Sequence, residues 1–254
     1  MVVVAASDAP AVERTHAGLA VTNGNCQREQ LWIPHVTRPL AHIRESKGAL
    51  RRKATVASLC TGLGPESRLP HALGVPMDFA FTSDCKESAY QWILRNGPDS
   101  ECHFVDLRHL MDSGTGICAK HGFQRCSITR WKKKLDLLIA GISCRPYSNA
   151  RAERKSGTAQ HQDAYLFDAF VKIMVILEPG AALFENVFGI SLPESRSDPV
   201  SPLQRMLDRI KTDLPMYSVT YFVTNGSLFL VWSRRRIWIF LYAQGEGWGC
   251  IPCC

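Results

Sequence analysis

Short apolar runs alternate along the chain, from Ala54 onward, with longer segments whose apolar residues recur every three or four positions. Short runs bounded by turn residues are typical of buried strands, and the longer periodic segments are typical of amphipathic helices. Regular alternation of the two is typical of βαβ units, in which helices connect the parallel strands of one sheet. We therefore predict an α/β fold with a mostly parallel sheet.

The boundaries of the predicted elements follow from the turn residues between them. Strands are predicted at 54–59, 79–83, 103–106, 135–140 and 181–185. Helices are predicted at 88–95, 164–177 and 202–211, and the second places its apolar residues on one face. Two further strands, 218–223 and 237–242, are close enough in sequence to pair as an antiparallel ribbon at the edge of the sheet.

The two ends of the chain lack this pattern. Residues 1–52 show little periodicity and contain scattered proline, glycine, asparagine and histidine, which predicts a loosely ordered N-terminal extension. Residues 53–243 contain all the predicted elements and form the folded domain. Residues 244–254 are predicted to be a disordered tail.

Composition and charge narrow the class of protein. The 254 residues are 46% hydrophobic and 21% charged, as in an ordinary globular protein, and the net charge is +7. A positive excess suits a polyanionic partner such as nucleic acid, although each basic cluster taken alone is more simply a solvated face. The best apolar run, 170–184, is broken by Lys172, Glu178 and Pro179, so we expect no membrane association.

The chain has ten cysteines, and its N-terminus lacks the basic and apolar regions of a secretory signal. Reduced thiols in an intracellular protein are therefore expected rather than a disulfide scaffold. Cys250 and Cys253 form a CxxC pair, but a zinc site needs two more ligands, and Cys118 and Cys126 are unevenly spaced from them. No metal site is predicted.

Glycines and acids follow the first three predicted strands. The first strand runs into Cys60-Thr61-Gly62-Leu63-Gly64, and such glycines allow a bound cofactor to approach the backbone closely. Asp84 ends the second strand about twenty residues later, where dinucleotide folds place an acid that accepts hydrogen bonds from ribose hydroxyls. Asp106 ends the third strand at the same sheet edge, within reach of an adenine amino group.

A cysteine follows the fourth predicted strand in a tight loop, Gly141-Ile142-Ser143-Cys144-Arg145-Pro146. A buried core thiol is the commoner fate of a lone cysteine, but the glycine and proline indicate an exposed loop at the carboxyl end of a strand. Glu185 ends the next apolar strand, within Glu185-Asn186-Val187. Arg234 and Arg236 precede the last strand at alternate positions, which places them on one face.

Taken together, these motifs resemble the catalytic domain of cytosine-5 DNA methyltransferases over about residues 54–243. That family's cysteine motif is usually Pro-Cys-Gln-Pro-Phe-Ser, its glycine motif Phe-Ser-Gly-x-Gly-Gly and its arginine motif Gln-x-Arg-x-Arg, and Glu-Asn-Val is unchanged here. Ser143, Arg145, Cys60 and Pro65 depart from these patterns. The resemblance implies the Rossmann-like fold of methyltransferases whose activity depends on S-adenosylmethionine. It also implies that residues 53–243 form the catalytic domain.

The resemblance also implies roles for individual residues. Cys144 attacks carbon 6 of cytosine, Glu185 hydrogen-bonds the ring N3 and the exocyclic amine, and Arg236, with Arg234, faces the base. Asn186 supports the loop around Cys144. The implied cofactor-binding residues are Cys60, Gly62, Leu63, Gly64, Asp84, Cys85, Asp106, Leu107, Ser143 and Leu166.

The implied function is methyl transfer to carbon 5 of cytosine in DNA. A tRNA cytosine-5 methyltransferase is an alternative, because 227–234 resembles the pattern before the arginines in that branch. A catalytically inactive nucleic-acid-binding remnant is another. No target-recognition region follows residue 243, so we expect either a truncated gene product or a partner that supplies target contacts. An intracellular location is expected, and a nuclear one if the organism is eukaryotic.

Overall fold

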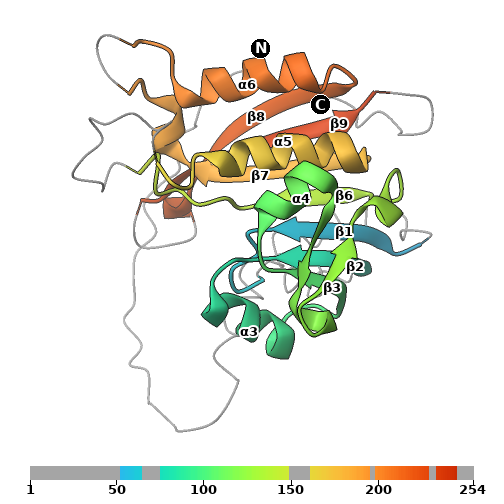
Figure 1. Cartoon of the computed structure of the whole chain (residues 1–254). Coiled ribbons are helices and arrows are strands. Elements are labelled where there is room, and N and C mark those ends of the chain that lie inside the picture. Colours follow the sequence, from blue (N-terminus) through green and yellow to red (C-terminus); the bar gives the residue numbers. More distant parts are fainter. Residues whose placement is uncertain (1–51, 65–74, 149–160, 195–197, 229–232, 245–254) are drawn as a thin grey trace, which may run out of the picture.

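A computed structural model describes residues 52–64, 75–148, 161–194, 198–228 and 233–244 (Figure 1). These residues form one nine-stranded sheet with the order β5-β4-β3-β2-β1-β6-β7-β9-β8. The predicted N-terminal extension and C-terminal tail fall almost wholly outside the described residues, as does most of the segment that follows Cys144.

The centre of the sheet is parallel, as predicted. β1 (Ala54–Leu59) lies between β2 (Met77–Ser83) and β6 (Leu137–Ala140). β3 (Ser100–Phe104) pairs with the outer side of β2, and β7 (Ala181–Val187) pairs with the outer side of β6. The chain order reverses between β1 and β6, and a crevice for ligands forms beyond the carboxyl ends of the strands at such a switch point.

The two edges of the sheet are antiparallel. β8 (Tyr217–Asn225) and β9 (Arg235–Ala243) pair with each other, and β9 also pairs with β7, which confirms the predicted ribbon. At the other edge, β4 (Thr115–Cys118) and β5 (Gln124–Ser127) form a hairpin beside β3. That hairpin was not predicted, because four-residue strands are too short to show a period.

In the described part of the chain, four α-helices connect the strands: α3 (Glu87–Asn96), α4 (Leu107–Ser113), α5 (Tyr165–Leu177) and α6 (Pro202–Asp213). In Figure 1, α4, α5 and α6 lie side by side along the sheet, and α3 lies apart from them. Short 3₁₀ helices occur at Ala119–His121, Thr129–Trp131, Phe188–Ser191 and Gly226–Leu228. Within the described residues, no helix is both long and apolar enough to cross a bilayer.

The core lies between the sheet and α5. The apolar face predicted for this helix is buried, and Phe167 and Phe170 pack their rings against Phe184 of β7. The short helix α4 was not predicted. Its N-terminus is capped by the Asp106 side chain, and Gly114 ends it in the left-handed conformation, with φ of 66°.

Candidate active site

A cavity of about 700 Å³ opens at the carboxyl edge of the parallel strands. Its wall is built from the loops after β1, β2 and β6, the end of β7, the first turns of α3 and α5, and the start of β9. Most of the predicted site residues line it: Cys60, Gly62, Leu63, Asp84, Cys85, Ser143, Cys144, Leu166, Glu185, Arg234 and Arg236. Residues as far apart in sequence as Cys60 and Arg236 therefore meet in one cavity. This is expected because the strands that carry them begin or end at the same edge of the sheet.

The loop after β1 has the backbone conformation that its glycines allow. Gly62 and Gly64 have φ of 58° and 68°, in the left-handed region. Among the described residues, apart from Gly62 itself and its two chain neighbours, no heavy atom lies within 4 Å of the position that a Cβ on Gly62 would occupy, so they leave room for a ligand to approach the backbone there. Cys60, at the family's aromatic position, also has a positive φ of 54°, and burial and nearby Asp84 raise the pKa of its thiol to about 12.

Asp84 is held rigidly at the wall of the cavity. One carboxylate oxygen accepts the Gly62 N–H at 2.9 Å, and the other accepts the Lys86 N–H at 2.9 Å. A carboxylate has about four acceptor positions, so these two hydrogen bonds orient the group and leave capacity for a ligand's hydroxyl groups.

Asp106, Leu107 and Gly64 were predicted to bind the cofactor, but they do not line the cavity. The Asp106 carboxylate accepts the Arg108 backbone N–H at 2.9 Å and pairs with the Arg108 guanidinium at 2.7 Å. Leu107 is buried in the core. Asp106 therefore caps α4, and its predicted contact with adenine stays a prediction.

The Cys144 loop presents an exposed thiol to the cavity. A turn holds the loop, in which the Tyr147 N–H donates to the Cys144 carbonyl at 2.9 Å. The Ser143 hydroxyl donates to the Asp163 carboxylate at 2.7 Å and lies 3.4 Å from the Arg145 amide nitrogen, which donates to it. A hydrogen bond to the start of α5 thus anchors the position at which the family usually has proline.

Glu185 and Arg236 form an ion pair in the wall of the cavity. Arg236 Nε lies 2.8 Å from Glu185 Oε1, and the two side chains are 19% and 29% exposed, respectively. Burial raises the pKa of Glu185 above its ordinary value, while Arg236 and Arg234 act in the opposite direction. Arg234 lines the same cavity, whereas Arg235 places its guanidinium over the Phe188 ring, as the predicted alternation requires.

Asn186 was predicted to support the loop around Cys144, but it is buried and does not line the cavity. Its side-chain oxygen accepts the Val187 N–H at 2.8 Å. Its side-chain nitrogen has no hydrogen-bond partner among the described residues. Its role in supporting the loop around Cys144 stays a prediction.

Several residues of the cavity wall were not predicted. Ser88, Ala89 and Trp92 lie on one face of α3, and Asp163 and Tyr165 lie at the start of α5. Burial raises the pKa of Tyr165 to about 12. The helix predicted at 88–95 contains Ser88, Ala89 and Trp92, and their spacing places them on one face. Considering which face of that helix lies beside Asp84 would have revealed them.

The basic clusters differ in their surroundings. Arg130 pairs with Glu101 at 3.2 Å, and Lys132 and Lys133 pair with Glu178 at 2.8 and 3.3 Å. That cluster is balanced by its own acids, which favours the solvated-face interpretation. The cations that line the cavity are instead Lys86 after β2, Arg145 of the Cys144 loop, and Arg234 and Arg236 at the start of β9.

The sheet order and its carboxyl-edge cavity define a Rossmann-like fold, in which a thiol, a carboxylate and guanidinium groups face one another across a ligand site. The model of the C-5 cytosine-specific DNA methylase family matches residues 119–250, half of the chain. The chain belongs to this family. The matched span contains Cys144, Glu185, Arg234 and Arg236.

Two solved structures are similar to the chain over part of their length. The S. pombe Dnmt2 methyltransferase is 15% identical with a TM-score of 0.49, and the match covers 77% of this chain and 51% of that one. A putative DNA modification methyltransferase encoded within a prophage (E. coli) is 16% identical with a TM-score of 0.49, covering 75% and 47%. The chain thus spans about half the length of these proteins. A search of curated proteins found no match.

Proposed function

We propose that this chain transfers a methyl group from S-adenosylmethionine to carbon 5 of cytosine in DNA, through a covalent adduct with Cys144. The observation that carries the proposal is the single cavity. Gly62 and Asp84 line one side of the cavity, and Cys144, Glu185 and Arg236 line the other. A cofactor and a base bound there would be neighbours, as group transfer requires.

The residues present fit the proposed cofactor. The open space at Gly62 admits a ligand to the backbone, and the oriented Asp84 carboxylate can accept hydrogen bonds from ribose hydroxyls. Leu63 and Trp92 add apolar surface. The cavity volume lies within the range of about 300–1,000 Å³ usual for small-molecule sites. S-adenosylmethionine, when bound, supplies the electrophilic methyl group.

The proposed chemistry begins at the thiol. The Cys144 thiolate forms a bond to carbon 6, the 5–6 double bond breaks, and its electron pair moves to the 4–5 bond as N3 takes a proton; the resulting enamine makes carbon 5 nucleophilic. Glu185 holds the ring N3, and burial raises its pKa, which is the direction that a proton donor at N3 requires. Arg236 balances the charge that develops on the ring. After carbon 5 is methylated, its proton passes to a base, the carbon–sulfur bond breaks and the thiolate is restored.

DNA is the favoured substrate because the family's description names it. Arg145 and Arg234 add positive charge at the cavity, which suits a nucleic-acid backbone. Because Cys144 lies in a cavity, the target base must leave its stack before it reaches the thiol. Arginine side chains bind phosphate groups well, so they suit the strand that flanks such a base.

The test is trapping with 5-fluorocytosine, which lacks the carbon-5 proton and therefore holds the adduct. The 254-residue chain is incubated with S-adenosylmethionine and either a DNA duplex or a tRNA transcript that contains the analogue. Denaturing gels and peptide mass spectrometry then detect the adduct. We expect a DNA adduct on Cys144 that is absent in Cys144→Ser and present in Cys253→Ser, the matched thiol control.

The other outcomes separate the alternatives. An adduct on tRNA alone would replace the DNA proposal with the tRNA activity. If a folded chain forms no adduct and calorimetry detects no S-adenosylmethionine binding, the chain is an inactive remnant. An adduct that persists in Cys144→Ser would overturn the assignment of the nucleophile.

A further inference from the structure

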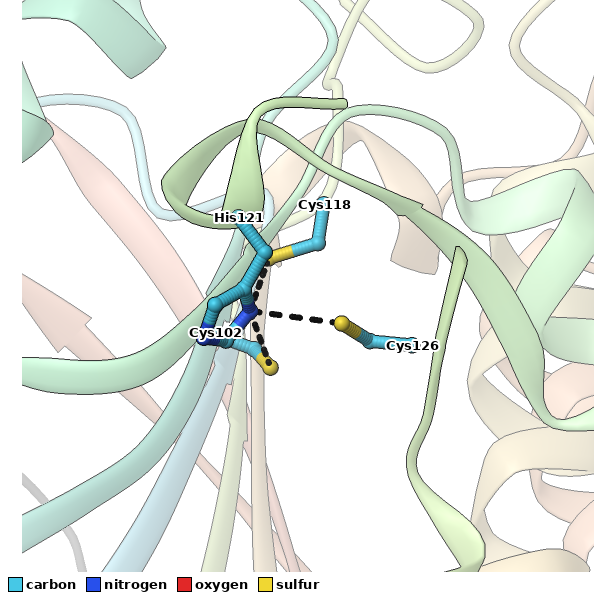
Figure 2. Close-up of side chains that lie close together, drawn as sticks. All are labelled: Cys102, Cys118, His121 and Cys126. Atoms are coloured by element: carbon cyan, nitrogen blue, oxygen red, sulfur yellow. Dashed lines mark hydrogen bonds between the residues drawn. The ribbon is translucent and has the colours of Figure 1, made fainter. Parts of the chain in front are cut away.

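A second cluster of reactive side chains lies at the β3–β4–β5 edge of the sheet. Cys102 comes from β3, Cys118 from the end of β4, His121 from the following 3₁₀ helix and Cys126 from β5 (Figure 2). His121 Nδ1 lies 3.6, 3.2 and 3.3 Å from the sulfur atoms of Cys102, Cys118 and Cys126. All four ligand atoms lie within 4.8 Å of one another.

Hydrogen bonding alone does not account for this arrangement. A neutral imidazole nitrogen carries either one proton or one lone pair, so Nδ1 can satisfy at most one of the three sulfur atoms well. Two of the three sulfur atoms would then lie close to Nδ1 without a good hydrogen bond to it, and Cys102 and Cys118 are buried while Cys126 is half-buried. A cation at the centre would satisfy all four atoms together.

The distances match those of a tetrahedral metal site. With zinc–sulfur bonds of about 2.3 Å and a zinc–nitrogen bond of about 2.0–2.1 Å, a regular tetrahedron places nitrogen about 3.5 Å from each sulfur. The distances from His121 Nδ1 to the three sulfur atoms, 3.2–3.6 Å, surround that value. The side chains already have nearly the geometry that the ion requires.

A cation lies beside the cluster. Arg130 donates to Cys102 Sγ at 3.4 Å and also pairs with Glu101 at 3.2 Å. Three thiolates and one divalent cation carry a net charge of −1, and the Arg130 guanidinium lies next to that charge.

We propose that Cys102, Cys118, His121 and Cys126 bind one Zn²⁺ ion as a structural site. Thiolate and imidazole ligands select zinc over magnesium or calcium, which prefer oxygen. Protein ligands would fill all four positions, whereas catalytic zinc sites keep one open. None of the four residues lines the active-site cavity, so the site is separate from the proposed methyl transfer and does not depend on it.

The position of the ion explains what it would stabilise. In the described residues, β3 and β4 share a single register pair, Phe104 with Cys118, so the hairpin is weakly attached to the sheet. The ion would cross-link β3 to both strands of the hairpin. Phe123, in the hairpin loop, packs its ring against Tyr90 of α3 at 6.3 Å between centroids. The site would therefore also stabilise the helix that carries Trp92 into the cavity.

The first test is the metal content of the full 254-residue chain. After purification without chelators, inductively coupled plasma mass spectrometry is expected to give about one zinc ion per chain. Replacement with Co²⁺ should produce the intense visible bands of a tetrahedral site and a thiolate-to-cobalt charge-transfer band. X-ray absorption spectroscopy of the zinc in the unmodified chain should show three sulfur ligands and one nitrogen ligand. A zinc-free folded chain, or a disulfide among these cysteines, would overturn the proposal.

Variants then assign the ligands. We expect His121→Asn and Cys126→Ser to lose most of the bound zinc and to melt at a lower temperature. His109→Asn, on the exposed side of α4, and Cys85→Ser, an exposed thiol outside the cluster, are the matched controls and should keep the metal. Equal zinc content in all four variants would refute the ligand assignment, and circular dichroism would show which of them are folded.

Discussion

Replacing Arg236 with methionine should reveal the energy of the Glu185–Arg236 pair. The substitution keeps an apolar stem of similar length and removes the guanidinium, so Glu185 loses its partner at 2.8 Å. Exposed ion pairs contribute about 0–1 kcal/mol, whereas breaking a buried pair costs about 3–5 kcal/mol. With side chains 19% and 29% exposed, this pair lies between those limits. We expect Arg236→Met to lower the free energy of unfolding by about 2 kcal/mol.

The loss should depend on pH in a defined direction. Burial raises the pKa of Glu185, so the folded state binds its proton more tightly than the unfolded state. Protonation of Glu185 therefore stabilises the fold as pH falls through the window between its unfolded and folded pKa values. Removing Arg236, which lowers this pKa, should raise the pKa further. The destabilisation by Arg236→Met should thus be largest above the pKa of Glu185 and shrink as pH falls.

The assay is urea denaturation of a double-mutant cycle, with Glu185→Gln as the second change, at neutral pH and at about pH 5. An effect of about 2 kcal/mol corresponds to a fall in melting temperature of about 4–8 °C in a domain of this size. Arg235→Met is the control, since its guanidinium stacks on Phe188 and does not contact Glu185. If the two arginine variants are equally stable, or if the cycle is additive at neutral pH, the reasoning is wrong.

Two further predictions concern the loop after β1 and the two strand-end acids. Gly62→Ala should lower the free energy of unfolding, measured by urea denaturation, by about 1 kcal/mol, because an alanine is strained at a φ of 58°. Gly141→Ala is the control: the space around it is equally open and its φ is not positive, so the free energy of unfolding should fall by less. Asp84→Ala should weaken S-adenosylmethionine binding by about tenfold in calorimetry, a loss of one charged hydrogen-bond acceptor. Asp106→Ala should mainly remove the cap of α4 and lower stability by about 1 kcal/mol. Equal losses of cofactor affinity in the two Asp variants would contradict the positions seen in the structure.

The parallel sheet was predictable because its strands are local features of the sequence. Strand 54–59 has the predicted bounds, and the strands near 79–83 and 181–185 differ from prediction by two residues at one end. Buried strands and the apolar face of α5 require a composition that shows in any short window. The β4–β5 hairpin lacks such a signal, since its four-residue strands alternate weakly and its stability comes from neighbours.

The candidate active site was also largely predictable. Cys144 and Asp84 each follow a strand that the sequence marks clearly, and Glu185 lies near the carboxyl end of another, so they share one edge of the sheet. Asp106 also follows a strand, yet its carboxylate is turned toward Arg108. Strand order places a residue at an edge, but only the local hydrogen bonds decide where its side chain points.

The amino-acid sequence by itself determined the fold class, the family and the residues of the thiol, acid and arginine motifs, because each depends on a short run of chain. The tertiary structure alone decided which of these residues share the cavity and how Glu185 pairs with Arg236. It also decided the partners of Cys118 and Cys126. The sequence analysis weighed only Cys250 and Cys253 beside Cys118 and Cys126 and predicted no metal site, whereas strand pairing brings Cys102 and His121 to Cys118 and Cys126. Ligand sets of this kind come from contacts between separate strands, and no spacing along the chain records those contacts.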